Sequence, residues 1–84
     1  MESNPELKSA IMEVVDNQIN SNDPPETRQT LYRLKNEGHS ESKAKELIGC
    51  VVASEIFEVL KRQESFNLNR FVKALNNLPK IPED

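Results

Sequence analysis

The 84-residue chain has no tryptophan, one tyrosine, three phenylalanines, two glycines and a single cysteine. One cysteine excludes an intramolecular disulfide and a cysteine-rich zinc site. No glycine-rich phosphate loop, nucleotide-binding fingerprint or metalloprotease histidine pair occurs. Only 36% of the residues are apolar, so a chain near the lower size limit for folding without disulfides has a thin core, made mainly of Leu, Ile and Val.

No charge of one sign dominates the chain either. The formal net charge is −3 and acidic and basic residues are interspersed, which argues against a nucleic-acid partner. The first ten residues, MESNPELKSA, lack the basic start and apolar stretch of a signal peptide. No segment approaches the roughly 20 apolar residues that span a bilayer. We therefore expect a cytoplasmic protein with no membrane partner.

Apolar residues recur at three- and four-residue spacing in four segments, and no segment alternates with the period of a strand. The first expected helix, residues 4–20, begins with Asn4 as its cap; its apolar stripe consists of Leu7, Ala10, Ile11, Val14, Val15 and Ile19. The second, residues 24–37, is expected to be capped by Asp23 and to bury Leu31 and Leu34. Gly38 stands where a left-handed terminating residue is needed.

The third expected helix, residues 41–62, follows the cap residue Ser40 and has the widest apolar stripe: Ala44, Leu47, Ile48, Val51, Val52, Ile56, Phe57, Val59 and Leu60. A stripe of this width predicts a central helix, or one covered from a second side by a partner chain. Gly49 and Ala53 lie on the same face of this helix. Either they mark the close approach of another helix, or Gly49 is simply tolerated inside the helix. Leu47 and Phe57 are expected to lie in the core.

The fourth expected helix, residues 67–78, is capped by Asn67, with Phe66 packing on Phe71 as a hydrophobic staple. Proline ends this helix, and the tail, residues 79–84, is expected to be loose. The sequence thus predicts an all-α, single-domain bundle of about four helices, with the third helix central.

Part of this pattern resembles a prokaryotic family of small all-helical domains of unknown function. The residues that carry the resemblance, within about residues 4–61, are Asn4-Pro5-x-Leu7, Gln18-Ile19, Asp23-Pro24-Pro25, Arg33-Leu34, Gly38 and the helix from Ala44 to Leu60. The resemblance implies a helical fold and says little about activity.

Many members of that family carry two histidines four residues apart on the first helix and two more on the third, a spacing that would suit a metal site. The matching positions here are Lys8, Met12, Ser42, Glu46, Cys50 and Ser54. Only Glu46 and Cys50 are good ligands, and Lys8 would place a cation against the ion. We therefore expect no metal site and no cofactor.

The remaining reactive side chains have ordinary explanations. His39, the sole histidine, is expected in a solvated turn, since a general base would need a nucleophile or an orienting acid nearby. Cys50 is expected to be a small buried thiol, because mid-helix supplies none of the positive charge that activates a catalytic cysteine.

Charged side chains on the expected helices are read as solvated faces. Two carboxylate sets could meet if the first and third helices lie side by side: Glu13, Asp16, Glu46, Glu55 and Glu58. Di-iron bundles usually add Glu-x-x-His, which is missing. A basic cluster around the second helix could form a weak anion surface, although solvated cations are the simpler interpretation; it comprises Arg28, Arg33, Lys35, Lys43 and Lys45.

These observations favour a non-enzymatic protein-interaction or regulatory module over an enzyme. Its partner is an unidentified protein, and a homodimer through the third helix is possible because the second helix offers little apolar surface to cover the third. The alternative is a metal-binding or metal-enzyme-derived domain in which Glu46 and Cys50 retain some ligand function. A helix-turn-helix reader is disfavoured, because the recognition helix would be the most apolar segment of the chain.

Overall fold

The computed structural model describes residues 5–82, which form four helices and contain no strand. The helices are α1 (Pro5–Ser21), α2 (Pro25–Asn36), α3 (Glu41–Arg62) and α4 (Leu68–Asn77). The predicted all-α class is confirmed. The predicted ranges for the second and fourth helices extend one residue further at each end, and the proposed cap Asn4 lies outside the described residues.

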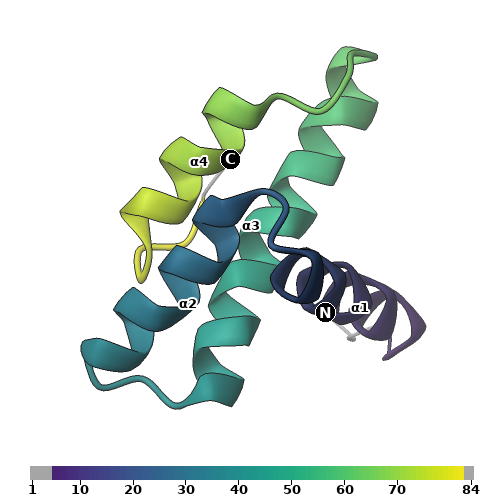
Figure 1. Cartoon of the computed structure of the whole chain (residues 1–84). Coiled ribbons are helices and arrows are strands. Elements are labelled where there is room, and N and C mark those ends of the chain that lie inside the picture. Colours follow the sequence, from purple (N-terminus) through teal and green to yellow (C-terminus); the bar gives the residue numbers. More distant parts are fainter. Residues whose placement is uncertain (1–4, 83–84) are drawn as a thin grey trace.

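Helix α3 is central, as predicted, and packs against all three other helices. In Figure 1, α2 and α4 lie along one side of α3, and α1 crosses it on the other side. Within the described residues α1 contacts α2 and α3 but not α4. The core comprises Val15, Leu31, Leu34, Ala44, Leu47, Ile48, Val51, Val52, Phe71, Leu75 and Leu78.

Three of the local signals at the helix ends, Ser40, Asn67 and Gly38, act as the sequence predicts. Ser40 Oγ accepts a hydrogen bond of 3.1 Å from the Lys43 N–H, and Asn67 Oδ1 accepts one of 3.0 Å from the Arg70 N–H. These side chains satisfy amides that have no partner within their own helix. Gly38 has φ of +102°, a left-handed conformation that glycine adopts without strain.

The expected staple before α4 is also present, with the ring centroids of Phe66 and Phe71 separated by 5.3 Å. Phe71 is buried whereas Phe66 is half exposed. The contact therefore fixes the direction in which the chain enters α4 and places Phe71 in the core.

The predicted cap at the start of α2 is wrong. Pro24, rather than Asp23, occupies the cap position, and no side chain bonds to the helix end there. The Asp23 N–H instead donates to Gln18 O in the turn that closes α1, at 3.1 Å. Because Pro24 and Pro25 have no N–H, fewer amides at this end need a capping oxygen.

A buried ion pair joins α3 to α4. Arg70 approaches both carboxylate oxygens of Glu55, with Nε–Oε1 and Nη2–Oε2 distances of 2.8 Å, and the Asn67 N–H donates to Oε2 at 2.9 Å. Burial acts to raise the pKa of Glu55, but the Arg70 and Asn67 hydrogen bonds and the Arg70 charge outweigh it, so this pKa is lowered. Glu55 was expected on a solvated face; it is instead a buried clamp between helices.

Arg33 joins α2 to α4 through hydrogen bonds. Its guanidinium donates to Leu75 O and to Leu78 O, each at 3.0 Å. These carbonyls lie at the carboxyl end of α4, where a cation also meets the negative end of the helix dipole. Beyond α4, residues 78–80 form a turn in which the Lys80 N–H donates to Asn77 O at 3.0 Å; residues 83–84 lie outside the described residues.

Candidate functional site

Helices α1 and α3 approach each other closely at Gly49. A Cβ atom at this position would lie 3.2 Å from Met12 Sδ and 3.5 Å from Ile11 Cγ2. The first distance is shorter than an ordinary van der Waals contact. Of the two interpretations of Gly49, the close approach of another helix is therefore confirmed.

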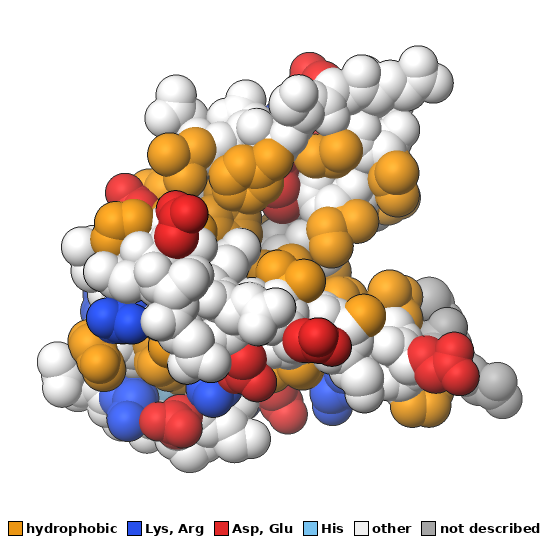
Figure 2. Space-filling model, turned by 45° about the vertical axis from the view of Figure 1, so that its right-hand side comes forward, with side chains coloured by type: hydrophobic (Ala, Val, Ile, Leu, Met, Phe, Trp, Pro, Cys, Tyr) orange, Lys and Arg blue, Asp and Glu red, His pale blue; other side chains and the backbone are white. Residues whose placement is uncertain are grey.

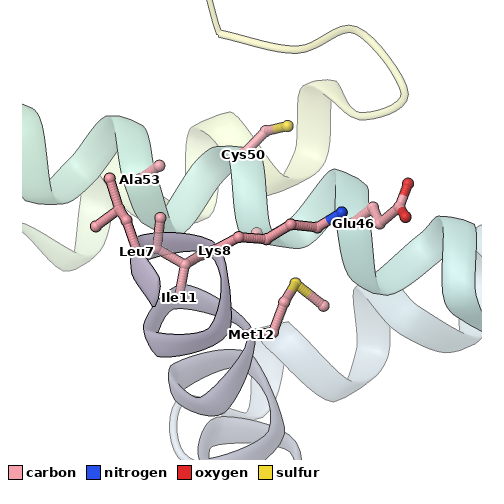
Figure 3. Close-up of a pocket in the computed structure, with 8 residues that line it drawn as sticks. Leu7, Lys8, Ile11, Met12, Glu46, Cys50 and Ala53 are labelled. Carbon is pink, nitrogen blue, oxygen red and sulfur yellow. The ribbon is translucent and has the colours of Figure 1, made fainter. Parts of the chain in front are cut away.

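A groove of about 370 Å³ opens beside this crossing. Figure 3 shows the side chains of α1 and α3 that form it, and its lining consists of Leu7, Lys8, Ile11, Met12, Glu46, Gly49, Cys50 and Ala53. The lining is mainly apolar. One amino group, one carboxylate and one thiol are the polar features at its edge.

The groove brings together four of the six positions that match the family histidines. Lys8 and Met12 come from α1, and Glu46 and Cys50 come from α3. Ser42 and Ser54 do not line it. Since Lys8 extends along the groove in Figure 3, a cation shares the space in which an ion would sit.

A metal centre finds little support elsewhere in the part of the chain that the structure describes. Over residues 5–82, no three His, Cys, Asp or Glu side chains are placed so that they could hold one ion together. Glu46 and Cys50 remain a pair of possible ligands at one groove, with Met12 as a weak third donor.

The prediction that Cys50 is buried is wrong, because this residue is exposed. One residue along a helix turns the side chain by about 100°. Gly49 faces α1 directly, so the Cys50 side chain points past the edge of that contact. The thiol thus lies at the rim of the groove and not in the core.

The apolar stripe of α3 is only partly covered. Ile56, Phe57 and Leu60 have exposed fractions of 45%, 51% and 72%. The expected burial of Phe57 is therefore wrong. Helix α1 crosses α3 near Gly49 and does not reach α4 in the described structure, so the carboxyl-terminal half of α3 keeps one side open.

The amino-terminal half of α1 is similarly open. Of its predicted stripe only Val15 is buried; Leu7 is 57% exposed and Val14 is 36% exposed. Figure 2 shows hydrophobic side chains lining a hollow between α1 and the end of the molecule that α3 and α4 form. We use the name open α3 face for the uncovered residues of α3: Cys50, Ala53, Ile56, Phe57 and Leu60.

The acidic residues do not converge on one point. Asp16 pairs with Lys45 at 3.0 Å, and Glu58 pairs with Arg62 at 2.6 Å. The hydrogen bond to Asp16 raises the pKa of Lys45 despite partial desolvation. Together with the Glu55 pair, these contacts place three of the five candidate carboxylates in separate ion pairs. No di-metal arrangement results within the described residues.

The basic cluster around α2 is largely engaged in internal contacts. The Arg28 guanidinium donates to Ile19 O at 2.6 and 3.1 Å, and Lys35 pairs with Glu41 at 3.2 Å. Arg33 donates to carbonyl oxygens of α4, and Lys45 pairs with Asp16, so four of the five cations of this cluster have partners. An anion surface is therefore the weaker interpretation of this cluster.

His39 lies in the turn between α2 and α3, where it is half-buried. Its backbone N–H donates to Leu34 O at 3.1 Å and so helps to end α2. This placement gives His39 a structural reason to be present that does not involve catalysis.

The role of Leu7 as a wall of the groove was not predicted from the sequence. The even spacing of the α1 stripe predicts burial along its whole length. Residue types alone carry no signal for the crossing angle that leaves both helix ends uncovered.

No helix within residues 5–82 is both long enough and apolar enough to cross a membrane. Searches against models of protein families, against curated proteins and against solved structures find no match.

Proposed function

We propose that this chain is a non-enzymatic protein-interaction module that uses the open α3 face and the adjoining groove. One observation carries the proposal: the apolar stripe of α3 continues past the α1 crossing, and Phe57 and Leu60 on it remain 51% and 72% exposed. Contiguous exposed apolar patches of several hundred Å² are uncommon on soluble monomers and commonly mark contact sites.

The composition of the face supports a protein contact. Phe57 is an aromatic anchor of the kind that is enriched at interfaces, and Lys61 lies 6.0 Å from its ring centroid. Glu46 and Lys61 provide charge at the two ends, outside the apolar centre. An apolar centre with a charged rim is the usual anatomy of a recognition surface.

The rest of the molecule provides a rigid platform for this face. The opposite side of α3 is held by the buried Glu55–Arg70 ion pair and by core residues that include Ile48 and Val51. Side chains on a helix held in this way keep fixed positions, which lowers the entropy lost on binding.

Site-specific photo-crosslinking in cells tests the proposal. A photoreactive phenylalanine derivative placed at Leu60 should form covalent adducts with a bound protein. The matched control is the same derivative at Tyr32, which lies on α2 and is also exposed, at 56%. Adducts at residue 60 with few at residue 32 support the proposal; no adduct at residue 60, or equal yields at both sites, would contradict it.

The metal-binding alternative has one observation in its favour, which is that Glu46, Cys50 and Met12 line the same groove. Zinc or copper(I) titration of the purified chain, compared with Cys50→Ser, tests it directly. Stoichiometric binding that the substitution removes would favour this alternative over the interaction module.

A further inference from the structure

Glu46 and four residues of the open α3 face recur with the spacing of a helix-pairing seam. Glu46, Cys50, Ala53, Phe57 and Leu60 follow one another at intervals of four, three, four and three residues. This alternation places them in one line along the helix, as the a and d positions of a coiled coil are placed. All five are at least partly accessible, while α2 and α4 cover the other side of α3.

We propose that the molecule on this face is a second copy of the same chain, paired through antiparallel α3 helices about a two-fold axis beside Ala53. This inference rests on the proposed function, because it names the partner of the same surface. A two-fold contact requires one patch to be complementary to itself. The open α3 face meets this requirement in its charges and its shape.

The charges select the antiparallel arrangement. Glu46 lies seven residues before Ala53 and Lys61 lies eight residues after it. In an antiparallel pair each Lys61 therefore faces the Glu46 of the other copy, and the pairing occurs twice. A parallel pair would instead place each charge beside its own kind, which destabilises an interface.

The shapes are complementary in the same register. Phe57 and Cys50 lie almost equally far from the axis on opposite sides, so the Phe57 ring of one copy meets the groove rim of the other near Cys50. The groove there is walled by Leu7 and Met12 of α1 and has a volume of about 370 Å³. Each copy thus supplies both an aromatic side chain and an apolar groove that receives it.

A small residue beside the axis allows the two helices to approach. Ala53 lies at the centre of the seam, and a small side chain at a crossing permits a short distance between helix axes.

Charge reversal with sedimentation equilibrium tests the pairing. Lys61→Glu and Glu46→Lys should each weaken dimerisation about tenfold, and the double variant should return to within about threefold of the wild type. Phe57→Asp should abolish dimerisation, whereas Tyr32→Asp on α2 should leave it unchanged. A double variant as weak as the single variants, or a dimer that survives Phe57→Asp, would overturn the proposal.

Disulfide trapping tests the register. In the proposed pair the two Cys50 residues are about 10 Å apart along the helix axis, too far for a disulfide. Mild oxidation should therefore leave the wild type uncrosslinked, while Ala53→Cys in a Cys50→Ser background should form a covalent dimer. Gln29→Cys in the same background is the control for random collision, since this residue is exposed on α2.

The outcomes separate this inference from the proposed function. Rapid crosslinking through native Cys50 would indicate a different register and overturn the antiparallel pair. A monomer of 9.6 kDa at every concentration up to about 1 mM would also overturn the antiparallel pair. Such a result would mean that dimerisation is weaker than ~4 kcal/mol. If photo-adducts at residue 60 then still contain another protein, the proposed function stands with a different partner.

Discussion

Truncation of two apolar residues on α3, Leu47 and Phe57, should lower the free energy of unfolding by different amounts. Leu47 is only 7% exposed and belongs to the core, whereas Phe57 is 51% exposed on the open α3 face. Leu47→Ala removes buried methyl groups and leaves a cavity, which costs about 2–5 kcal/mol. A domain of this length has a total stability of about 4–13 kcal/mol, so this loss is a large fraction of it.

The expected loss for Phe57→Ala is smaller. Complete burial of a phenylalanine side chain is worth about 1.5–3 kcal/mol, and about half of this one is already in contact with water. No cavity forms, because the site is open, and alanine favours the helix by a few tenths of a kcal/mol. We expect Phe57→Ala to lower the free energy of unfolding by about 1 kcal/mol or less.

Urea unfolding followed by circular dichroism at 222 nm measures both variants. With a slope of about 1 kcal/mol per molar urea, the midpoint should fall by about 2 M or more for Leu47→Ala and by about 1 M or less for Phe57→Ala. The chain must be dilute, since dimers stabilise the folded state by mass action. Equal losses for the two variants would refute the assignment of Phe57 to an open face.

Three further perturbations test the contacts that hold the helices. The pKa of Glu55 is lowered in the folded protein. The contribution of this carboxylate to stability is therefore present above its unfolded pKa of about 4.3 and is lost as the pH falls through the lower, folded pKa. Between pH 7 and pH 3 the urea midpoint should fall less steeply for Glu55→Gln than for the wild type. Arg33→Met removes the donors to Leu75 O and Leu78 O and should cost about 1–3 kcal/mol in chemical unfolding, whereas a change of less than ~0.5 kcal/mol would show that these bonds contribute little. Gln63 ends α3 with φ of 54°, a conformation in which glycine is less strained than other residues. Gln63→Gly should therefore raise the thermal midpoint and stabilise the fold by about 0.5–1 kcal/mol, whereas glycine inside a helix usually destabilises it.

Local signals in the sequence predicted the helix ends, because each depends on residues within one turn. Ser40 and Asn67 cap their helices through the amide three residues later, and Gly38 adopts its left-handed conformation next to α2. The cap predicted at Asp23 is wrong because Pro24 and Pro25 have no N–H, which leaves fewer amides at that helix end for a capping oxygen. The periodicity of the third segment also predicted its central place.

Long-range contacts could not be predicted in the same way. Glu55 and Arg70 are fifteen residues apart, and their pairing depends on the side of α3 that α4 occupies. The exposure of Cys50 and Phe57 depends on the angle at which α1 crosses α3. Apolar spacing specifies which face of a helix is buried, but it does not specify how far along the helix a neighbour extends.

The proposed contact between two copies of this chain through the open α3 face is tested most directly by NMR. The leucine methyl signals are followed while the chain is diluted from about 1 mM, a concentration at which even an affinity of ~4 kcal/mol gives dimers. The signals of Leu7 and Leu60 should shift with concentration, while those of the core residues Leu34 and Leu75 stay in place. Leu68, which is 46% exposed on α4, serves as the exposed control. Constant signals at Leu7 and Leu60, or an equal shift at Leu68, would contradict the account.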